Sequence, residues 1–238
     1  GRSQKWIARP SGSASRHLKI VKSKPDFGDK TMTNHITLLG DSVFDNGVYV
    51  ETGQDDVTAH LKRKLAPLGW TFENRAVDGH VAENVESQLL SHYVTKPCTF
   101  VLSVGGNNAL GYLDVIQDPL SDKSVGAVLM AFHQIREDFR RVYADALDKI
   151  RDHGQPLIVC TIYNPKFPEE NLQTLAEAGL SFFNDVIVEE ALKRDLSIID
   201  LRKVCSEREA FANPIEPSEV GGDLITDAII SIAQSMEE

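Results

Sequence analysis

The most constraining feature of this 238-residue sequence is a regular alternation of short apolar runs and longer amphipathic segments. The runs at 36–39, 99–104 and 157–162 are almost continuously apolar, which is typical of central parallel strands buried on both faces. Segment 124–152 repeats its apolar residues at three- and four-residue steps, which predicts a long helix. The expected strands are 35–40, 71–77, 99–105, 156–163 and 196–201, and the expected helices are 54–66, 81–91, 124–152, 171–194 and 218–235.

This alternation predicts an α/β fold in which a central parallel sheet of about five strands lies between two layers of helices. Binding sites in such sheets lie outside the carboxyl ends of the strands. Polar, glycine-containing turns follow the first three expected strands: Gly40-Asp41-Ser42, Asp78-Gly79-His80 and Gly105-Gly106-Asn107-Asn108. We therefore expect these turns to converge at one edge of the sheet.

The charge is unevenly distributed along the chain. Residues 1–31 carry eight Lys/Arg and two Asp/Glu, whereas the whole chain has a net charge of −10. We interpret 1–31 as a basic appendage outside the core, for instance from translation upstream of Met32, and 32–238 as a single domain. An arm that binds nucleic acid is the alternative, but its basic residues are scattered. The acidic remainder would repel nucleic acid and anionic membranes, so neither is an expected partner.

The composition also limits cofactors and location. No apolar run approaches the roughly 20 residues that a membrane span needs. Cys98, Cys160 and Cys205 have no CxxC spacing, so we expect buried free thiols, which suits a cytoplasmic protein. No histidine has a metal-ligating partner at a useful spacing, and we expect neither a metal nor another cofactor. The sequence carries no signal of oligomeric state.

Three segments in order resemble the conserved blocks of the GDSL, or SGNH, hydrolases. "GDSVFDNG" resembles the first block, which carries a nucleophilic serine, here Ser42. "NRAVDGHVAENV" resembles the second, which supplies a glycine, here Gly79, and "GGNN" resembles the third, GxND, with Gly105 and Asn107. The resemblance extends over nearly all of residues 34–236. It implies a flavodoxin-like α/β/α sandwich that hydrolyses small acyl esters with a Ser-His-Asp triad.

The resemblance also implies an oxyanion hole made of the Ser42 amide, the Gly79 amide and the Asn107 side chain. A glycine lets its N–H approach a substrate oxygen closely, and such donors stabilise the charge that develops in acyl transfer. The alternative is that these residues only form tight turns, but turn chemistry does not require Asn107 at its position. Asp41 and Asn108 flank these residues and are expected to support the site.

The fourth block departs from the family pattern. The family signature is DxxH, whereas "NPIEPSEVGG" places Asn213 at the aspartate and Glu216 at the histidine. The two replacements are mutually consistent, because a carboxylate at position 213 would repel Glu216, while the asparagine could donate a hydrogen bond to it. Asn108 likewise replaces the aspartate that usually ends the third block.

Two residues are candidates for the base that activates Ser42. Glu216 would need burial to raise its pKa from about 4.3 toward the range of about 6–7 where carboxylates act as general acids and bases. His80, beside Gly79, is the other candidate, although it also fits an exposed loop histidine. A distance of about 2.6–3.2 Å from the Ser42 hydroxyl to either group would identify the base.

The sequence therefore favours a hydrolase of carboxylic esters that uses Ser42 with a non-standard base. The alternative is a catalytically impaired protein that binds an acyl or carbohydrate ligand in the same cleft. A flavodoxin-like phosphate or flavin binder is disfavoured, because acidic side chains stand where a phosphate would bind. Tyr163, Asn164 and the 109–122 segment are expected to line the cleft, although Tyr163 and Asn164 fit a plain turn at least as well.

Overall fold

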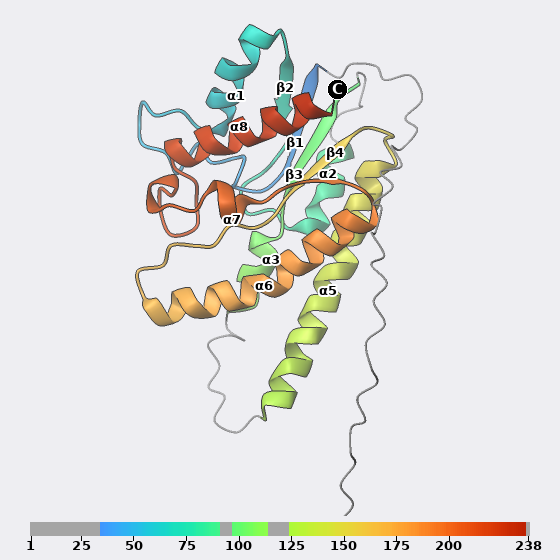
Figure 1. Cartoon of the computed structure of the whole chain (residues 1–238), viewed down its shortest axis with the longest axis vertical. Coiled ribbons are helices and arrows are strands. Elements are labelled where there is room, and N and C mark those ends of the chain that lie inside the picture. Colours follow the sequence, from blue (N-terminus) through green and yellow to red (C-terminus); the bar gives the residue numbers. More distant parts are fainter. Residues whose placement is uncertain (1–33, 91–96, 114–123, 237–238) are drawn as a thin grey trace, which may run out of the picture. The chain divides into compact units, whose positions relative to one another are not determined.

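A five-stranded parallel sheet forms the centre of the computed structural model, which describes residues 34–90, 97–113 and 124–236 (Figure 1). The strand order is β2-β1-β3-β4-β5, and each pair of neighbours is parallel. The sheet prediction is confirmed, and every strand lies within its expected range. The basic appendage predicted over 1–31 lies outside the described residues. The strands are β1 (His35–Gly40), β2 (Thr71–Asn74), β3 (Thr99–Ser103), β4 (Leu157–Cys160) and β5 (Ser197–Ile199).

Helices connect the strands, and the five expected from periodicity are present with ends shifted by a few residues. Polar side chains mark where several of them begin: Asp56 accepts a hydrogen bond from the amide of Ala59, and Ser218 accepts one from the amide of Gly221. These helices are α1 (Val57–Leu65), α2 (Val85–Leu90), α5 (Val125–Arg151), α6 (Glu170–Lys193) and α8 (Glu219–Ser235).

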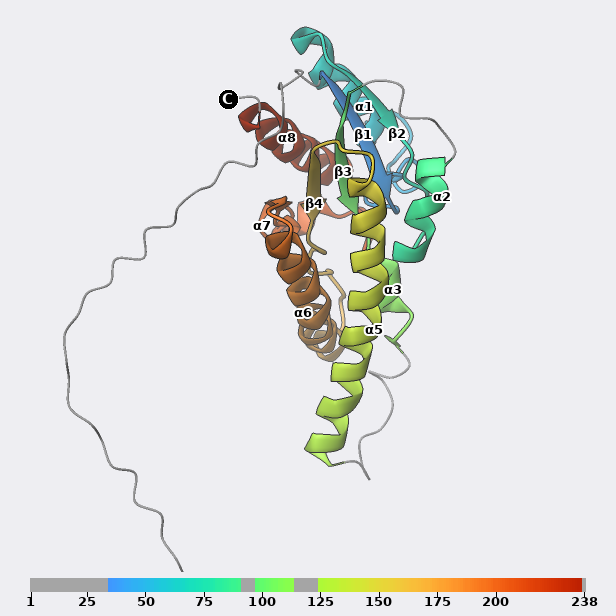
Figure 2. The same ribbon diagram turned by 90° about the vertical axis from the view of Figure 1, so that its right-hand side faces the viewer.

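The two faces of the sheet have separate hydrophobic cores. Successive strand side chains point to opposite faces, so Leu38 of β1 packs with α1 and α8, whereas Leu39 packs with α2, α5 and α6. The same alternation in β3 places Val101 on the first face and Leu102 on the second. The result is the predicted sandwich, with helices covering both faces of the sheet (Figures 1 and 2).

Several short elements were not expected from the sequence. The helix α3 (Gly106–Leu110) begins three residues after the end of β3, where only a turn was predicted, and α7 (Leu201–Val204) follows β5. Short 3-10 turns η1 (Ala66–Leu68), η2 (Ala82–Asn84) and η3 (Arg208–Ala210) complete the connections. Helix α3 is important for the site because it carries Asn107 and Asn108.

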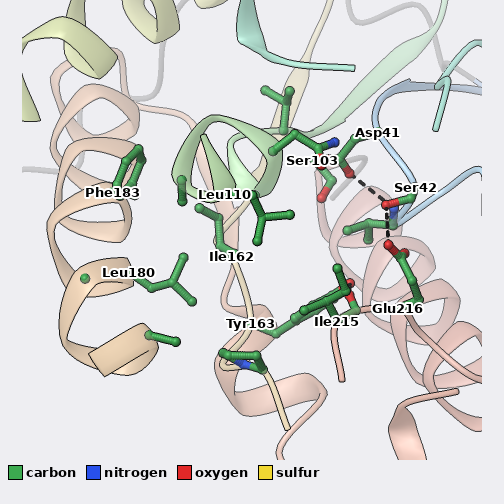
Figure 3. A pocket seen from close by; sticks show the side chains of 18 of the residues that line it. Asp41, Ser42, Ser103, Leu110, Ile162, Tyr163, Leu180, Phe183, Ile215 and Glu216 are labelled. Carbon is green, nitrogen blue, oxygen red and sulfur yellow. Dashed lines mark hydrogen bonds between the residues drawn. The ribbon is translucent and has the colours of Figure 1, made fainter. Parts of the chain in front are cut away.

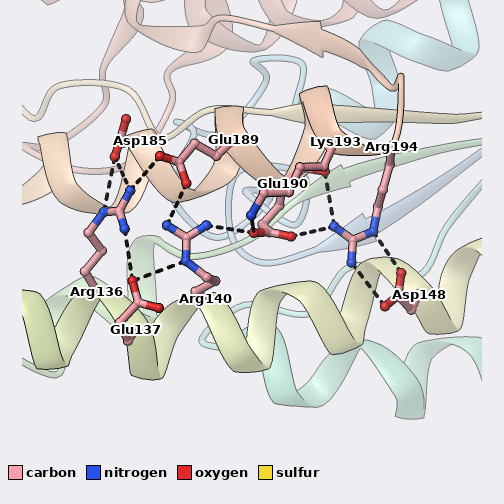
Figure 4. A network of polar contacts seen from close by, with 9 residues as sticks. All are labelled: Arg136, Glu137, Arg140, Asp148, Asp185, Glu189, Glu190, Lys193 and Arg194. Atoms are coloured by element: carbon pink, nitrogen blue, oxygen red, sulfur yellow. Dashed lines mark hydrogen bonds and ion pairs between the residues drawn. The ribbon is translucent and has the colours of Figure 1, made fainter.

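An ion-pair network joins α5 to α6 (Figure 4). At its centre Glu190, which is only 4% exposed, accepts hydrogen bonds from Arg140, Lys193 and Arg194. These partners hold the pKa of Glu190 at about 2 against the opposing effect of burial. The network therefore fixes α6 along α5, and α6 provides one wall of the pocket described below.

The three cysteines are free and buried, as predicted. Among the described residues, no helix combines the length and the apolar character that crossing a membrane requires.

Candidate active site

The turn after β1 is set by a glycine and by a glutamine from a distant helix. Gly40 has φ +133°, and a Cβ at this position would lie 1.8 Å from the carbonyl oxygen of Ser103. Gln88 of α2 binds both sides of Gly40: its Oε1 accepts from the Gly40 amide at 2.8 Å, and its Nε2 donates to the Gly40 carbonyl at 2.7 Å. These contacts determine the direction in which Asp41 and Ser42 leave the sheet.

Ser42 and Glu216 point toward one another at the carboxyl end of the sheet (Figure 3). The Ser42 hydroxyl donates a hydrogen bond of 3.1 Å to Glu216 Oε1, and both residues are buried. Glu216 Oε2 is also buried, and it has no hydrogen-bond donor in the described part of the chain. The nucleophile and the carboxylate predicted from the sequence therefore lie within the distance expected for a serine and its base.

Contacts from three directions hold the segment that carries Glu216. Tyr163, just beyond β4, donates its hydroxyl proton to the Ile215 carbonyl at 2.6 Å, and Asn46 donates to the Pro217 carbonyl at 3.1 Å. Asn213 Oδ1 accepts hydrogen bonds from the amides of Ile215 and Glu216, each at 2.9 Å. The expectation that Asn213 donates to the Glu216 carboxylate is therefore not met, because its side-chain oxygen stabilises the turn instead.

Burial alters the acidity of the two carboxyl groups beside Ser42. It raises the pKa of Glu216 to about 7, against the opposing hydrogen bond from Ser42 and with a smaller contribution from the charge of Asp78. Burial also raises the pKa of Asp41 to about 7, opposed by the hydrogen bond from the Val43 amide and assisted by the charge of Glu216. A carboxyl group of this pKa can both accept and return a proton near neutral pH.

The three expected oxyanion donors lie in turns or helices that follow β1, β2 and β3. The amides of Ser42 and Gly79 donate no hydrogen bond to another described residue. Gly79 has φ +79°, which a glycine adopts without strain. Asn107 Nδ2 donates one of its protons to the His80 carbonyl at 2.9 Å, which orients the amide group and leaves its second proton for a ligand.

His80 is bound away from Ser42. Its Nδ1 accepts a hydrogen bond of 2.9 Å from Gln88 Nε2, and no hydrogen bond joins it to Ser42 among the described residues. Asn108 is a structural bridge: its Oδ1 accepts from the Ala82 amide, and its Nδ2 donates to Glu83, each at 3.0 Å. His80 and Asn108 therefore connect the turns around the site, and within the described residues neither is hydrogen-bonded to Ser42.

A largely apolar pocket opens beside Ser42 (Figure 3). It runs from Ser42 and Glu216 past α3 to α6 and has an empty volume of about 810 Å³, part of which is open to solvent. Tyr163 lines it as predicted, whereas Asn164 does not, and residues 114–122 lie outside the described part of the chain. Its apolar wall consists mainly of Leu110, Leu113, Ile162, Phe167, Leu180 and Phe183.

A sequence profile of the GDSL-like Lipase/Acylhydrolase family matches residues 38–221, which include the Ser42 turn, Gly79, Asn107 and Glu216. The chain belongs to this family. It is an atypical GDSL protein, because Asn213 and Glu216 occupy the positions of the family's aspartate and histidine. No curated protein sequence matches the chain significantly.

Solved structures of two lipases and a phospholipase have the same fold. An extracellular lipase from Streptomyces rimosus is 17% identical, with a TM-score of 0.60, and the match covers 83% of this chain and 98% of that one. A lipase, Lip_vut3, from a goat rumen metagenome is 21% identical with a TM-score of 0.63, over 83% and 96%. A phospholipase A1 from Streptomyces albidoflavus is 16% identical with a TM-score of 0.59, over 83% and 98%. At these identities the likeness establishes the α/β/α fold.

Two parts of this GDSL site were missed by sequence reasoning. Gln88 was assigned only to an amphipathic helix, although it binds Gly40 and His80 at once. The contribution of α6 to the pocket was also missed, because its Ala176 and Gly179 read as ordinary small residues of a buried helix face. Gln88 follows the apolar Val85 at helical spacing and directly precedes the apolar Leu89, which places a polar residue on the buried face but does not reveal the distant backbone that it binds.

Proposed function

We propose that this GDSL protein hydrolyses carboxylic esters with Ser42 as the nucleophile and Glu216 as the general base. The observation that carries the proposal is the 3.1 Å hydrogen bond from the Ser42 hydroxyl to a buried carboxylate at the head of an apolar pocket. Family membership supports a hydrolase that acts on esters. The apolar wall favours an acyl chain over a carbohydrate as the group that the pocket receives.

In the proposed reaction the Ser42 oxygen attacks the ester carbonyl carbon while its proton passes to the Glu216 carboxylate. The negative charge on the carbonyl oxygen is stabilised by the amides of Ser42 and Gly79 and by the Asn107 side chain. When the tetrahedral intermediate collapses, the ester bond breaks and Glu216 returns the proton to the departing alcohol. Water then attacks the acyl carbon and loses a proton to Glu216. The bond from this carbon to the Ser42 oxygen breaks, Glu216 returns the proton to that oxygen, and the carboxylic acid is released.

The pKa of Glu216, about 7, supports its role in both directions of proton transfer. A glutamate with an ordinary pKa would accept a proton only weakly from a serine. His80 is the less favoured base, because its Nδ1 is already bound to Gln88. Asn213 is proposed as a positioning residue that fixes the turn before Glu216.

A fluorophosphonate probe tests the nucleophile. We expect the probe to label the wild-type protein and to leave the Ser42→Ala variant unlabelled. Ser206→Ala, which removes an exposed serine hydroxyl that hydrogen-bonds only to Glu207, is the matched control and should label normally. A folded wild-type protein that the probe does not label would contradict the proposal.

The second candidate is a catalytically impaired protein that binds an acyl ligand in the same pocket. It is favoured by the absence of a histidine hydrogen-bonded to Ser42 among the described residues. Without a working base, the oxyanion donors and substrate binding would still accelerate hydrolysis by roughly 10³–10⁴-fold over water. Turnover in that range, unchanged by Glu216→Gln, would favour this candidate over the esterase.

A further inference from the structure

The loops after β1 and β2 bring three polar residues together near the site, and we call Asp45, Tyr49 and Asp78 the acidic rim. The Tyr49 hydroxyl donates to Asp78 Oδ2 at 2.7 Å, and the Asp78 amide donates to Asp45 Oδ2 at 2.9 Å. The Asp45 amide donates to the Asp41 carbonyl at 3.1 Å, and Asp78 directly precedes Gly79, so the rim borders the Ser42 turn and the expected oxyanion donors. The rim is therefore continuous with the proposed catalytic site.

The acidic rim and the apolar pocket are formed by different residues around the Ser42 turn. The pocket is lined by residues that follow β1, β3 and β4 and by residues of α3 and α6, and it contains no member of the acidic rim. Asp45 and Tyr49 follow β1 in the chain, and Asp78 follows β2. In the sheet β2 is an edge strand, and it pairs with β1 on the side opposite to β3 and β4. An ester whose acyl chain occupies the pocket would therefore direct its alcohol portion toward the rim.

The negative charge at this place has no counterion in the described part of the chain. None of the ion pairs between described residues involves Asp41, Asp45, Asp78 or Glu216. Glu216 is only 6% exposed, and no described residue donates a hydrogen bond to its Oε2. The described residues also contain no group of three side chains arranged to hold a metal ion. The rim therefore suits an organic cation better than a metal.

A cation on the alcohol would also assist the proposed chemistry. Attack by Ser42 moves a negative charge from Glu216 to the ester oxygen, where the carboxyl groups of Asp41, Asp45 and Asp78 repel it, and a positive charge on the substrate would offset that repulsion. Tyr49 adds an aromatic ring, and such rings bind ammonium groups through the face of the ring. A neutral alcohol would gain neither contribution.

We propose that the acidic rim selects esters whose alcohol portion carries a quaternary or protonated amine. This inference rests on the proposed ester hydrolysis at Ser42 and names the class of substrate for that site.

The test compares two esters that differ in a single charge: butyrylcholine and its uncharged isostere, 3,3-dimethylbutyl butyrate. Both are measured at pH 8 with the Ser42→Ala variant as the blank. We expect kcat/KM for the choline ester to exceed that of the isostere by roughly tenfold, and the ratio to fall when salt is raised to 0.5 M. Asp78→Asn and Asp45→Asn should each bring the ratio closer to one.

Asp145→Asn is the matched control, because it removes one exposed carboxylate on α5 and changes the net charge equally. It should leave the ratio at its wild-type value. Equal hydrolysis of both esters by the wild-type protein would overturn the inference and leave the proposed function intact. Hydrolysis of neither ester above the Ser42→Ala blank would count against the proposed function itself.

Binding gives a readout that does not depend on turnover. The Ser42→Ala variant is titrated with each ester by calorimetry, and we expect the choline ester to bind roughly tenfold more tightly. Equal affinities would overturn the inference whatever the activity of the wild-type protein. A preference for the choline ester that Asp78→Asn removes would support it even if the proposed hydrolysis failed.

Discussion

The Ser42 hydroxyl and the Glu216 carboxylate are joined by a buried hydrogen bond of 3.1 Å, although they lie 174 positions apart in the chain. The fold makes this contact by ending β1 at the Ser42 turn and by tying the segment before α8 to Tyr163 and Asn46. The other oxygen of the carboxylate receives no hydrogen bond from the part of the chain that the structure describes. The arrangement thus leaves Glu216 able to take a proton from Ser42.

Replacing Glu216 with glutamine should reduce kcat by roughly 10²–10⁴-fold, which is the usual contribution of a general base. Glutamine keeps the size of the side chain and an oxygen that can accept from Ser42, but it cannot accept the proton. Steady-state hydrolysis of p-nitrophenyl butyrate measures the effect. Glu219→Gln is the control, because Glu219 lies in the same segment and glutamine retains the oxygen that accepts from the Asp55 amide. Equal activity of Glu216→Gln and the wild type would exclude Glu216 as the base.

Activity should rise with pH up to about 7, because Glu216 must be ionised to act and its pKa is about 7. Below that value log kcat/KM should increase by about one per pH unit, and above it the profile should be flat. A glutamate of ordinary pKa would give a plateau from about pH 5 upward. Because Asp41 also has a pKa of about 7, the midpoint belongs to the pair of carboxyl groups.

The Asp78→Asn variant sharpens this prediction. The charge of Asp78 raises the pKa of Glu216, so its removal should move the midpoint of the pH profile to a lower pH. A neutral substrate is used, so that the acidic rim does not change binding of the substrate by its charge. An unchanged midpoint would mean that Asp78 does not act on the group that controls activity.

Asp41 should make the protein less stable as the pH rises. Its pKa is about 7 in the folded state, above the value near 4 of an unfolded chain, so the folded state keeps a proton that the unfolded state releases. The resulting stability is fully present below about pH 4 and is lost as the pH rises through about 7. In the Asp41→Asn variant no group titrates at this position, so this loss of stability with rising pH does not occur. The asparagine keeps an oxygen that can accept the hydrogen bond from the Val43 amide. We expect the free energy of unfolding of this variant, relative to that of wild type, to increase by roughly 2–3 kcal/mol from pH 5 to pH 8.

Urea denaturation at pH 5 and pH 8 measures this difference in the free energy of unfolding. Asp145→Asn is a suitable comparison, since Asp145 is exposed and Lys149 is its one ion-pair partner among the described residues. Its difference from wild type should be nearly the same at both pH values. A difference between Asp41→Asn and wild type that does not grow with pH would show that Asp41 is not protonated in the folded protein.

The sequence predicts the sheet well because buried parallel strands require continuous apolar runs, and 99–104 and 157–162 are such runs. The strand pattern also predicts that the turns after β1, β2 and β3 converge at one edge of the sheet, whereas the contact between Ser42 and Glu216 was expected only from the family resemblance, since Glu216 precedes α8 and follows no strand directly. It does not predict Gln88, since an amide that binds a distant backbone has no local pattern. The expected hydrogen bond from the Asn213 amide group to the Glu216 carboxylate is absent among the described residues for a related reason: the Asn213 oxygen accepts from two nearby backbone amides instead, and only the path of the backbone decides which partners its side chain reaches.

Ala176, on the α6 wall of the pocket, offers a test of the acyl group. It is 7% exposed, so a phenylalanine in its place would fill space that a long acyl chain needs. We expect Ala176→Phe to lower kcat/KM for p-nitrophenyl octanoate by at least tenfold, because loss of even one methylene contact in such a pocket is worth roughly 1–3 kcal/mol. Hydrolysis of the acetate ester, whose acyl group ends near Ser42, should change much less.

Ala178→Phe, at an exposed position of the same helix, should leave the ratio of the two esters unchanged. Equal losses for both esters in Ala176→Phe would mean that the acyl chain lies outside this pocket.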